Sequence, residues 1–235
     1  MKKQPIFFLC FLAISISSIF ISCKNDDDDN NNLSSLSNVM VVNATPGSPG
    51  YDFYINDALQ NAGAINYTGS SAYIQTLSGS KNLKLNKTNT AENVINIDED
   101  LELGGSYTLL SLDTVGSIES IVLNDDLTEP ILGKSHLRVI HASHNSPAID
   151  IINLADSSVV FSNIGFRQTT AFTPVDAGSY ALGYRVLADT NIVSLSTPVT
   201  LTNRGIYTIV VSGFNSDTTG TPVSSLDIQL IDNVQ

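Results

Sequence analysis

An internal repeat constrains the fold of this chain more than any other feature. Residues 39–45 read VMVVNAT, and 98 positions later residues 137–143 read LRVIHAS; each segment is followed at the same spacing by Ser-Pro and by an aspartate. Further along, GSYTL at 105–109 matches GIYTI at 205–209, an offset of 100. A period of this length is the size of a domain and is much longer than a solenoid unit. The sequence therefore predicts a tandem duplication.

The boundary between the two copies is predicted at residues 128–135, where Pro130 and Gly133 punctuate a short linker. This places one domain at 37–127 and the other at 136–235. Because a domain-sized repeat implies a separate core in each copy, we expect few contacts between the copies. We also expect residues 134–235 to fold alone.

Each copy consists of short segments rich in Val, Ile, Tyr and Thr that are bounded by Gly, Asn, Asp and Pro, which is typical of strands and turns. Hydrophobic residues make up 42% of the chain and charged residues 14%, which fits a globular protein. The predicted fold class is all-β, with two tandem antiparallel β-sandwiches of immunoglobulin or transthyretin type. In the second copy, strands are expected near residues 136–142, 149–154, 158–163, 168–173, 179–188, 192–201, 205–213 and 224–232.

The N-terminal residues 1–22 are predicted to be a lipoprotein signal peptide. Two lysines precede an apolar run at 6–21 that is too short and too rich in serine for a membrane span. Ser22-Cys23 then resembles the end of a bacterial lipobox, in which the cysteine thiol is acylated and becomes the new N-terminus. Cys10 is the only other cysteine, so no disulfide can form in the exported chain. The alternative is an ordinary signal peptide followed by an incidental cysteine.

The residues that follow Cys23 are predicted to be a disordered acidic tether, 23–36. It contains Lys24 and four aspartates, Asp26, Asp27, Asp28 and Asp29, and has no apolar residue to bury before Leu33. This cluster resembles the export signal of surface lipoproteins of the Bacteroidetes, and the alternative is a simple spacer. The sequence therefore predicts a lipid-anchored protein of the outer membrane that faces the cell exterior; a periplasm-facing orientation stays open.

The repeated residues resemble a known bacterial family, the domain of unknown function 4397. In the second copy the resemblance rests on His141, Ser143, Pro147, Asp150 and Gly178, together with the residues around them. The first copy is a degenerate version that keeps Asp52 and Gly79 and has Asn43 in place of the histidine. The resemblance implies an extracytoplasmic all-β module, often in tandem, with no established activity.

Three histidines, His136, His141 and His144, are the candidates for a metal site. On a strand, His136 and His141 point to opposite faces, so only His141 and His144 could converge across the turn. The first copy has Asn38, Asn43 and Pro46 at these positions, which excludes a metal common to both copies. We therefore expect no metal and expect His141 to order the turn before Pro147.

The acidic residues are also predicted to be structural. Asp52 and Asp150 recur three residues after a proline, and each carboxylate is expected to accept backbone N–H groups of the preceding turn. A glycosidase needs two acids at one bond, whereas these two lie in different domains. The acids of residues 98–102 alternate along a strand and are expected to protect a sheet edge, with weak Ca²⁺ binding as the alternative.

Several function classes are excluded by charge and by missing motifs. The formal net charge of −12 disfavours nucleic acid as a partner. Gly133-Lys134-Ser135 lacks the earlier glycine of a phosphate-binding loop, and neither G-x-S-x-G nor H-E-x-x-H is present. The chain is therefore predicted not to be an enzyme and to need no cofactor or nucleotide. Thr114 and Thr218 follow aspartates in a short pattern that resembles an O-glycosylation acceptor.

The function predicted from the sequence is that of a surface-anchored, non-catalytic structural or adhesive module. Its membrane contact would be the lipid anchor alone, and its partner a protein or cell surface. The alternative is an accessory glycan-binding lipoprotein. That alternative needs an exposed aromatic platform, and the chain has no tryptophan.

Overall fold

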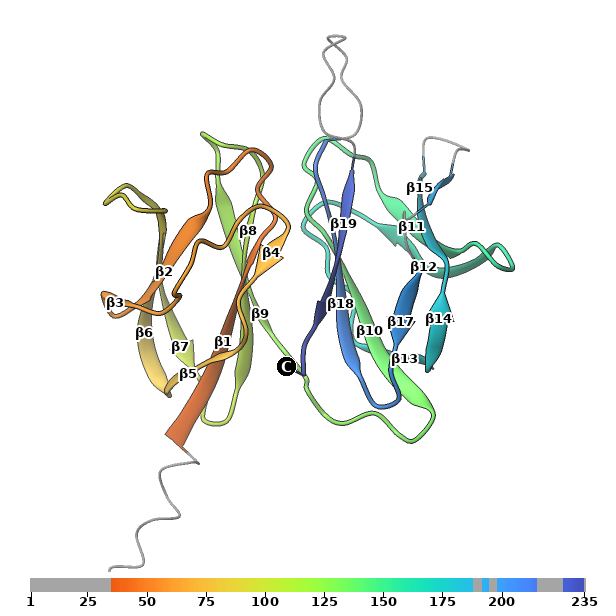
Figure 1. The fold of residues 1–235 in the computed structure, drawn as a ribbon, viewed down its shortest axis with the longest axis horizontal. Helices are drawn as coiled ribbons and strands as arrows, with labels where there is room; N and C mark the ends of the chain where they lie inside the picture. The colour runs from red at the N-terminus through yellow and green to blue at the C-terminus, as the bar shows by residue number, and fades with distance from the viewer. Residues whose placement is uncertain (1–34, 188–191, 195–197, 215–225, 235) are drawn as a thin grey trace, which may run out of the picture.

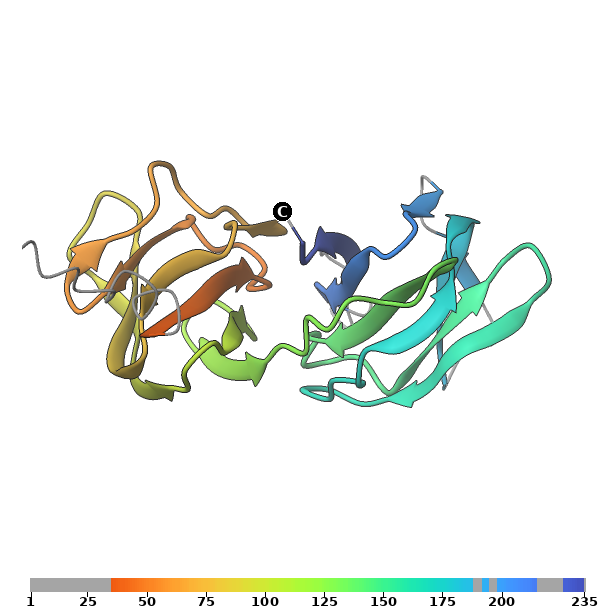
Figure 2. The same cartoon turned by 90° about the horizontal axis from the view of Figure 1, so that it is seen from below.

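The fold consists of two β-sandwiches that lie side by side (Figures 1 and 2). The computed structural model describes residues 35–187, 192–194, 198–214 and 226–234, and within these ranges it contains strands and no α-helix. The prediction of an all-β tandem fold is confirmed. We call the two sandwiches the first and the second repeat.

The first repeat contains two sheets. The inner sheet, next to the second repeat, has the order β4-β1-β8-β9, with β5 also paired to β1, and the outer sheet has the order β3-β2-β6-β7. The strands are β1 (Leu36–Asn43), β2 (Tyr51–Ile55), β3 (Ala58–Leu59), β4 (Gly69–Ser70), β5 (Ile74–Leu77), β6 (Gly79–Lys87), β7 (Asn93–Leu101), β8 (Ser106–Leu112) and β9 (Glu119–Asn124).

The second repeat has the same plan. Its inner sheet has the order β13-β10-β18-β19, its outer sheet the order β12-β11-β15-β16, and β14 pairs with β17. The strands are β10 (Lys134–His141), β11 (Ile149–Asn153), β12 (Ser158–Ile164), β13 (Thr173–Asp176), β14 (Gly178–Tyr180), β15 (Leu182–Val186), β16 (Ile192–Ser194), β17 (Val199–Leu201), β18 (Ile206–Ser212) and β19 (Asp227–Asp232).

The structure corrects the predicted strands of the second repeat in three places. The strand expected at 168–173 is β13 at Thr173–Asp176 instead. The strand expected at 179–188 is divided into β14 and β15, and the one expected at 192–201 corresponds to β16 and β17, which pair with different strands. The structure also corrects the predicted strand direction. The sequence predicts antiparallel sheets, whereas each inner sheet contains one parallel pair: β1 with β8, and β10 with β18. Their registers are equivalent, with Val39 opposite Tyr107 and Leu137 opposite Tyr207. The remaining paired strands are antiparallel.

Each repeat has its own hydrophobic core between its inner and outer sheets. The core of the first repeat contains Val39, Val41, Tyr51, Phe53, Ile55, Ile65, Leu83, Leu85, Ile95, Leu101, Tyr107 and Leu109. The core of the second repeat contains Leu137, Val139, Ile149, Ile151, Phe161, Ile164, Leu182, Tyr184, Val186, Val199, Leu201, Tyr207, Ile209, Val211 and Leu226.

A third core lies between the repeats, where the two inner sheets face each other. It contains Met40, Val42, Ala44, Leu110 and Leu112 of the first repeat and Ile140, Ala142, Val210 and Ile231 of the second. Because side chains alternate along a strand, odd residues of β1 enter the repeat's own core and even residues enter the shared one. The expectation of few contacts between the copies is therefore wrong.

The two repeats point the same way, which defines two ends of the molecule (Figure 1). At one end, which we call the base, the described chain begins before β1, and the loops 102–105, 125–133 and 202–205 lie beside it. At the opposite end, which we call the distal end, lie the loops 44–50, 113–118 and 142–148. The first described residues of the chain therefore lie at the base.

Candidate functional site

A buried ion pair connects the two repeats beside their shared core. The guanidinium group of Arg138, on β10, lies 2.6 Å from the carboxylate of Asp125, which follows β9. The two side chains are 3% and 0% exposed. Arg138 also donates hydrogen bonds to the hydroxyl groups of Thr208 (2.8 Å) and Thr108 (3.2 Å), and its guanidinium lies over the ring of Phe172. A buried charge is tolerated only when it is paired and hydrogen-bonded in this way.

Further polar groups complete this cluster. The hydroxyl groups of Thr108 and Tyr73 donate to Asp125 at 2.6 and 2.5 Å. The side-chain amide of Asn233 donates to the Tyr73 hydroxyl and its carbonyl accepts from Thr208. Burial, with the Asp125 carboxylate adding to it, raises the pKa of Tyr73 well above its usual value, so the phenol stays a donor. The cluster thus fixes one repeat against the other.

His141 orders the turn that follows β10, as the sequence predicted. Its ring is fully buried; Nδ1 accepts the Ser143 N–H (3.3 Å) and Nε2 lies 3.2 Å from the Pro147 carbonyl oxygen. These partners fit a neutral ring with its proton on Nε2. Burial lowers the pKa of His141, which also favours the neutral form.

Asn43 orders the equivalent turn of the first repeat. Its side-chain oxygen accepts the Thr45 N–H at 3.1 Å, and its amide donates to the Ile65 carbonyl and to the Ser48 hydroxyl. An amide and a neutral imidazole can both accept a backbone N–H and donate to a backbone carbonyl. This explains how Asn and His exchange between the two copies.

Asp52 and Asp150 are structural, but their donors are not those predicted. The carboxylate of Asp52 accepts from the Asn89 N–H (2.9 Å) and the Thr88 hydroxyl (3.1 Å), which lie in the turn after β6. Asp150 accepts from the Asn163 N–H at 2.9 Å and pairs with Arg185. The preceding turn supplies neither bond, because each aspartate lies on a strand whose neighbours in the outer sheet are closer.

The two glycines of the family motif, Gly79 and Gly178, differ in backbone conformation. Gly79 has φ = +90°, a conformation that favours glycine, whereas no positive φ is recorded at Gly178. A Cβ at either position would meet no atom within 4 Å. Only Gly79 is therefore needed for its backbone conformation.

The other predicted candidates do not converge on a metal site. His144 leaves the strand and lies 3.4 Å from the Asp113 carboxylate of the first repeat, packed edge-on to Phe166 and Phe214. Within the described ranges, no three His, Cys, Asp or Glu side chains gather closely enough to hold a metal ion. The acidic strand β7 is the edge strand of its sheet, with Asp98 and Asp100 exposed.

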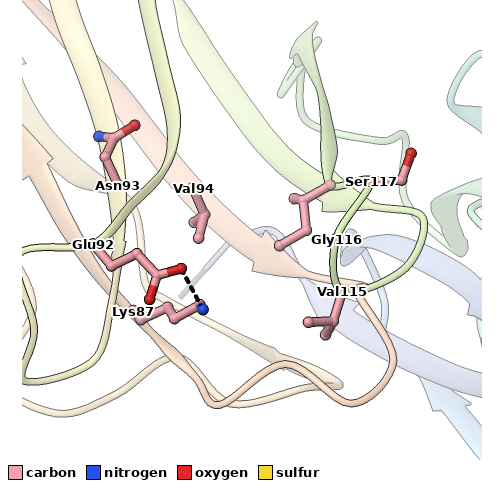
Figure 3. Close-up of a pocket in the computed structure, with 8 residues that line it drawn as sticks. Lys87, Glu92, Asn93, Val94, Val115, Gly116 and Ser117 are labelled. Atoms are coloured by element: carbon pink, nitrogen blue, oxygen red, sulfur yellow. Dashed lines mark ion pairs between the residues drawn. The ribbon is translucent and has the colours of Figure 1, made fainter.

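The distal end of the first repeat contains an open hollow of about 370 Å³ (Figure 3). The end of β6 supplies Lys87, the turn that follows supplies Glu92, and the start of β7 supplies Asn93 and Val94. Lys87 forms an ion pair with Glu92. The loop after β8 supplies residues 115–118, of which Val115 is half exposed. The Asp113–His144 contact joins this loop to the second repeat, so loops of both repeats meet at the distal end.

Several sequence-predicted residues lie outside the described ranges: Cys23, Lys24, Asp26, Asp27, Asp28, Asp29 and Thr218. Thr114 is described and is half-buried in the loop after β8. In the described part of the chain, no helix is long and apolar enough to cross a membrane.

Comparison with known families agrees with the repeated motif and its two copies. The profile of the domain of unknown function DUF4397 matches residues 37–152 and again residues 135–229. The chain belongs to the DUF4397 family. The two DUF4397 matches cover both sandwiches and confirm the tandem arrangement.

Other comparisons add little to this assignment. No curated protein matches the DUF4397 chain. A solved carbohydrate-binding module of family CBM26 from Eubacterium rectale Amy13K, in complex with maltoheptaose, is 9% identical. The alignment covers 83% of this chain and 96% of that module with a TM-score of 0.24, which is too low to support a shared function.

The interface between the repeats is the feature that sequence reasoning missed. A signal was present: β1 contains the apolar run VMVV at residues 39–42 and β18 the run IVV at residues 209–211, neither with polar alternation. Such runs indicate strands buried on both faces. Arg138 is the one charged residue within the corresponding run of β10, and it marks the centre of the buried cluster.

Proposed function

We propose that this DUF4397 chain is a surface-anchored, non-catalytic module that presents its distal end to a protein partner. The observation that supports this most directly is the arrangement of the ends. The described chain begins at the base of the first repeat, just before β1, whereas loops of both repeats lie at the distal end (Figure 1). The shared core and the Arg138–Asp125 cluster hold these loops in one relative position. A lipid on Cys23 would then direct the distal end away from the membrane.

The surface of the described residues favours a protein partner over a glycan. Every Tyr and Phe ring in the described ranges is buried or half-buried, so these ranges offer no flat exposed aromatic platform for a sugar. The distal hollow combines the apolar side chains Val94, Val115 and Ile118 with the Lys87–Glu92 pair. This mixture is typical of a protein-binding surface.

The anchor is tested by Cys23→Ser. We expect the variant to lose fatty-acid labelling and to leave the membrane fraction, because Cys23 is the only cysteine after the signal segment. Export without labelling of the unsubstituted protein would instead support the ordinary signal peptide.

The binding face is tested by a matched pair of substitutions, Val115→Asp and Val159→Asp. Val115 lies at the distal end and Val159 on the edge strand β12, and they are 49% and 47% exposed. We expect Val115→Asp to weaken binding of the purified chain to intact cells about tenfold, and Val159→Asp to have no effect. Equal loss in both variants, or saturable binding to one polysaccharide on a glycan panel, would contradict the proposal.

A further inference from the structure

The base of the molecule carries the most exposed hydrophobic side chains of the described structure. Large apolar side chains exposed to solvent as isolated residues are ordinary, but a group of them at one end indicates an interaction surface. The five most exposed are Leu132 (75%), Ile131 (73%), Leu103 (64%), Leu77 (62%) and Val234 (61%).

Two of these side chains flank the point where the tether joins the first repeat. Leu77 lies opposite Leu36 in the ladder between β5 and β1. Leu103 is at the tip of the loop 102–105, whose Gly104 N–H donates to the Leu36 carbonyl at 2.9 Å. Both leucines therefore lie beside Leu36, at the end of the described chain that leads to Cys23.

The other three lie at the base of the second repeat. Ile131 and Leu132 precede β10 in a turn whose hydrogen bonds include those from the Gly133 N–H to the Asn203 side chain (2.6 Å) and from the Arg204 N–H to the Lys134 carbonyl (2.7 Å). The loop 202–205 is the counterpart of 102–105. Val234 follows Asn233, whose N–H donates to the Ile206 carbonyl at 2.8 Å, at the start of β18.

We propose that the base rests on the lipid leaflet that holds the anchor, with these apolar side chains seated in the interfacial layer. This inference rests on the proposed lipid anchor. Eleven residues separate Cys23 from Ser35, and a chain of that length reaches at most about 40 Å when fully extended, so the base stays within reach of the surface. Apolar loop side chains at that depth leave water without crossing the bilayer. Contact of both repeats with the leaflet would also orient the long axis of the strands away from the membrane and direct the distal end outward.

The charges at the base favour an apolar contact over an electrostatic one. Two cations beside the apolar loops of the second repeat are neutralised in ion pairs, Lys134 with Asp176 (2.7 Å) and Arg204 with Glu129 (2.8 Å). In the first repeat, Lys81 donates to the Ser78 and Ser80 carbonyls and lies opposite Glu99 in the ladder between β6 and β7. The loop 102–105 adds the exposed Glu102. Binding by a basic surface would require anionic lipid and would weaken with salt. The base is instead expected to contact zwitterionic lipid with little dependence on salt.

The absence of tryptophan from the chain makes a direct test possible. The chain from Cys23 onward is coupled through its single thiol to a maleimide lipid in phosphatidylcholine vesicles that contain brominated acyl chains. Single tryptophans are placed at the base by Leu103→Trp and Leu132→Trp, and on the side of the molecule by the matched control Val159→Trp. Chemical coupling replaces cellular acylation, so the result does not depend on whether cells modify Cys23.

We expect bromine to quench both base tryptophans about twofold or more, since interfacial side chains lie ~5–10 Å into the headgroup and acyl boundary. The Val159→Trp control should be quenched much less, and added salt should change neither result. Equal quenching at all three positions, quenching at only one repeat, or no quenching would overturn the proposal. Failure of Cys23→Ser to release the protein from cells would refute the anchor while leaving this vesicle result standing.

Discussion

The two repeats are alike where each faces its own core and differ where they face each other. Val39 and Leu137 occupy the same core position, and Tyr107 and Tyr207 pair with them in the same register. One residue further along, the shared face has Met40 in the first repeat and Arg138 in the second. The duplication has therefore kept the sandwich and changed the interface.

The residue that pairs with Arg138 shows the same divergence. Asp125 donates its N–H to Ser106 and Asn233 donates its N–H to Ile206, so the two occupy equivalent positions. If two second repeats paired through this face, each arginine would meet Asn233; if two first repeats paired, each Asp125 would meet Met40. Either arrangement would bury unpaired charges, which costs several kcal/mol per ion. The difference between the copies thus favours pairing of one first repeat with one second repeat.

Separating the repeats should have the largest effect. In the fragment 134–235, Ile140, Val210 and Ile231 lose their cover in the shared core. At 1.5–3 kcal/mol for each large aliphatic side chain, the loss is roughly 5–9 kcal/mol, comparable with the whole stability of a domain. We therefore expect the fragment to unfold or to aggregate non-specifically, which reverses the prediction that it folds alone. Thermal unfolding and sedimentation of the fragment and of residues 35–235 provide the measurement.

Adding the first repeat as a separate fragment, residues 35–133, is the control for this experiment. It should restore a soluble one-to-one complex, because the shared face is complementary. A monomeric 134–235 fragment that unfolds cooperatively at the temperature of the full chain would show that the interface contributes little.

Replacing one partner of the buried ion pair should have the next largest effect on stability. Arg138→Met gives the second repeat the residue of the first, and leaves Asp125 buried without its cation. We expect the free energy of unfolding of residues 35–235 to fall by about 3–5 kcal/mol in a denaturant titration. Asp125→Asn alone should be similarly damaging, because it leaves the arginine unpaired.

The double variant Arg138→Met with Asp125→Asn distinguishes the cost of an unpaired buried charge from the cost of altered side-chain packing. It removes both ions and gives each repeat the residue of the other, so most of the loss should be recovered. If the two single losses instead add in the double variant, the ion pair is not the source of the effect.

The sequence predicts those features of the fold that depend on neighbouring residues, and does not predict those that depend on contacts between distant segments. The all-β class and the role of His141 follow from local pattern, because turn residues and strand composition act within a few positions of each other, and the repeat is visible by aligning the sequence with itself. The parallel pairing of β1 with β8 could not be predicted, because it joins segments about 70 residues apart with no connecting motif. The Arg138–Asp125 pair depends on the placement of two sheets, which no single segment specifies. The donors to Asp52 and Asp150 were misassigned for the same reason, since they come from neighbouring strands and turns of the outer sheet.

The smallest expected effect is a difference in pH dependence between the copies. Burial lowers the pKa of His141, so below about pH 6.5 the unfolded chain takes up a proton that the folded chain does not. His141 therefore makes the free energy of unfolding fall as pH decreases, by at most about 1.4 kcal/mol per pH unit for one proton. His141→Asn, the residue of the first repeat, should remove this contribution while keeping the bond from the Ser143 N–H. The reciprocal change, Asn43→His, should add a second such contribution, since Asn43 is equally buried. Denaturant titrations between pH 7.5 and 5.5 compare the three proteins, and identical slopes for the unsubstituted chain and His141→Asn would show that the imidazole is not held neutral.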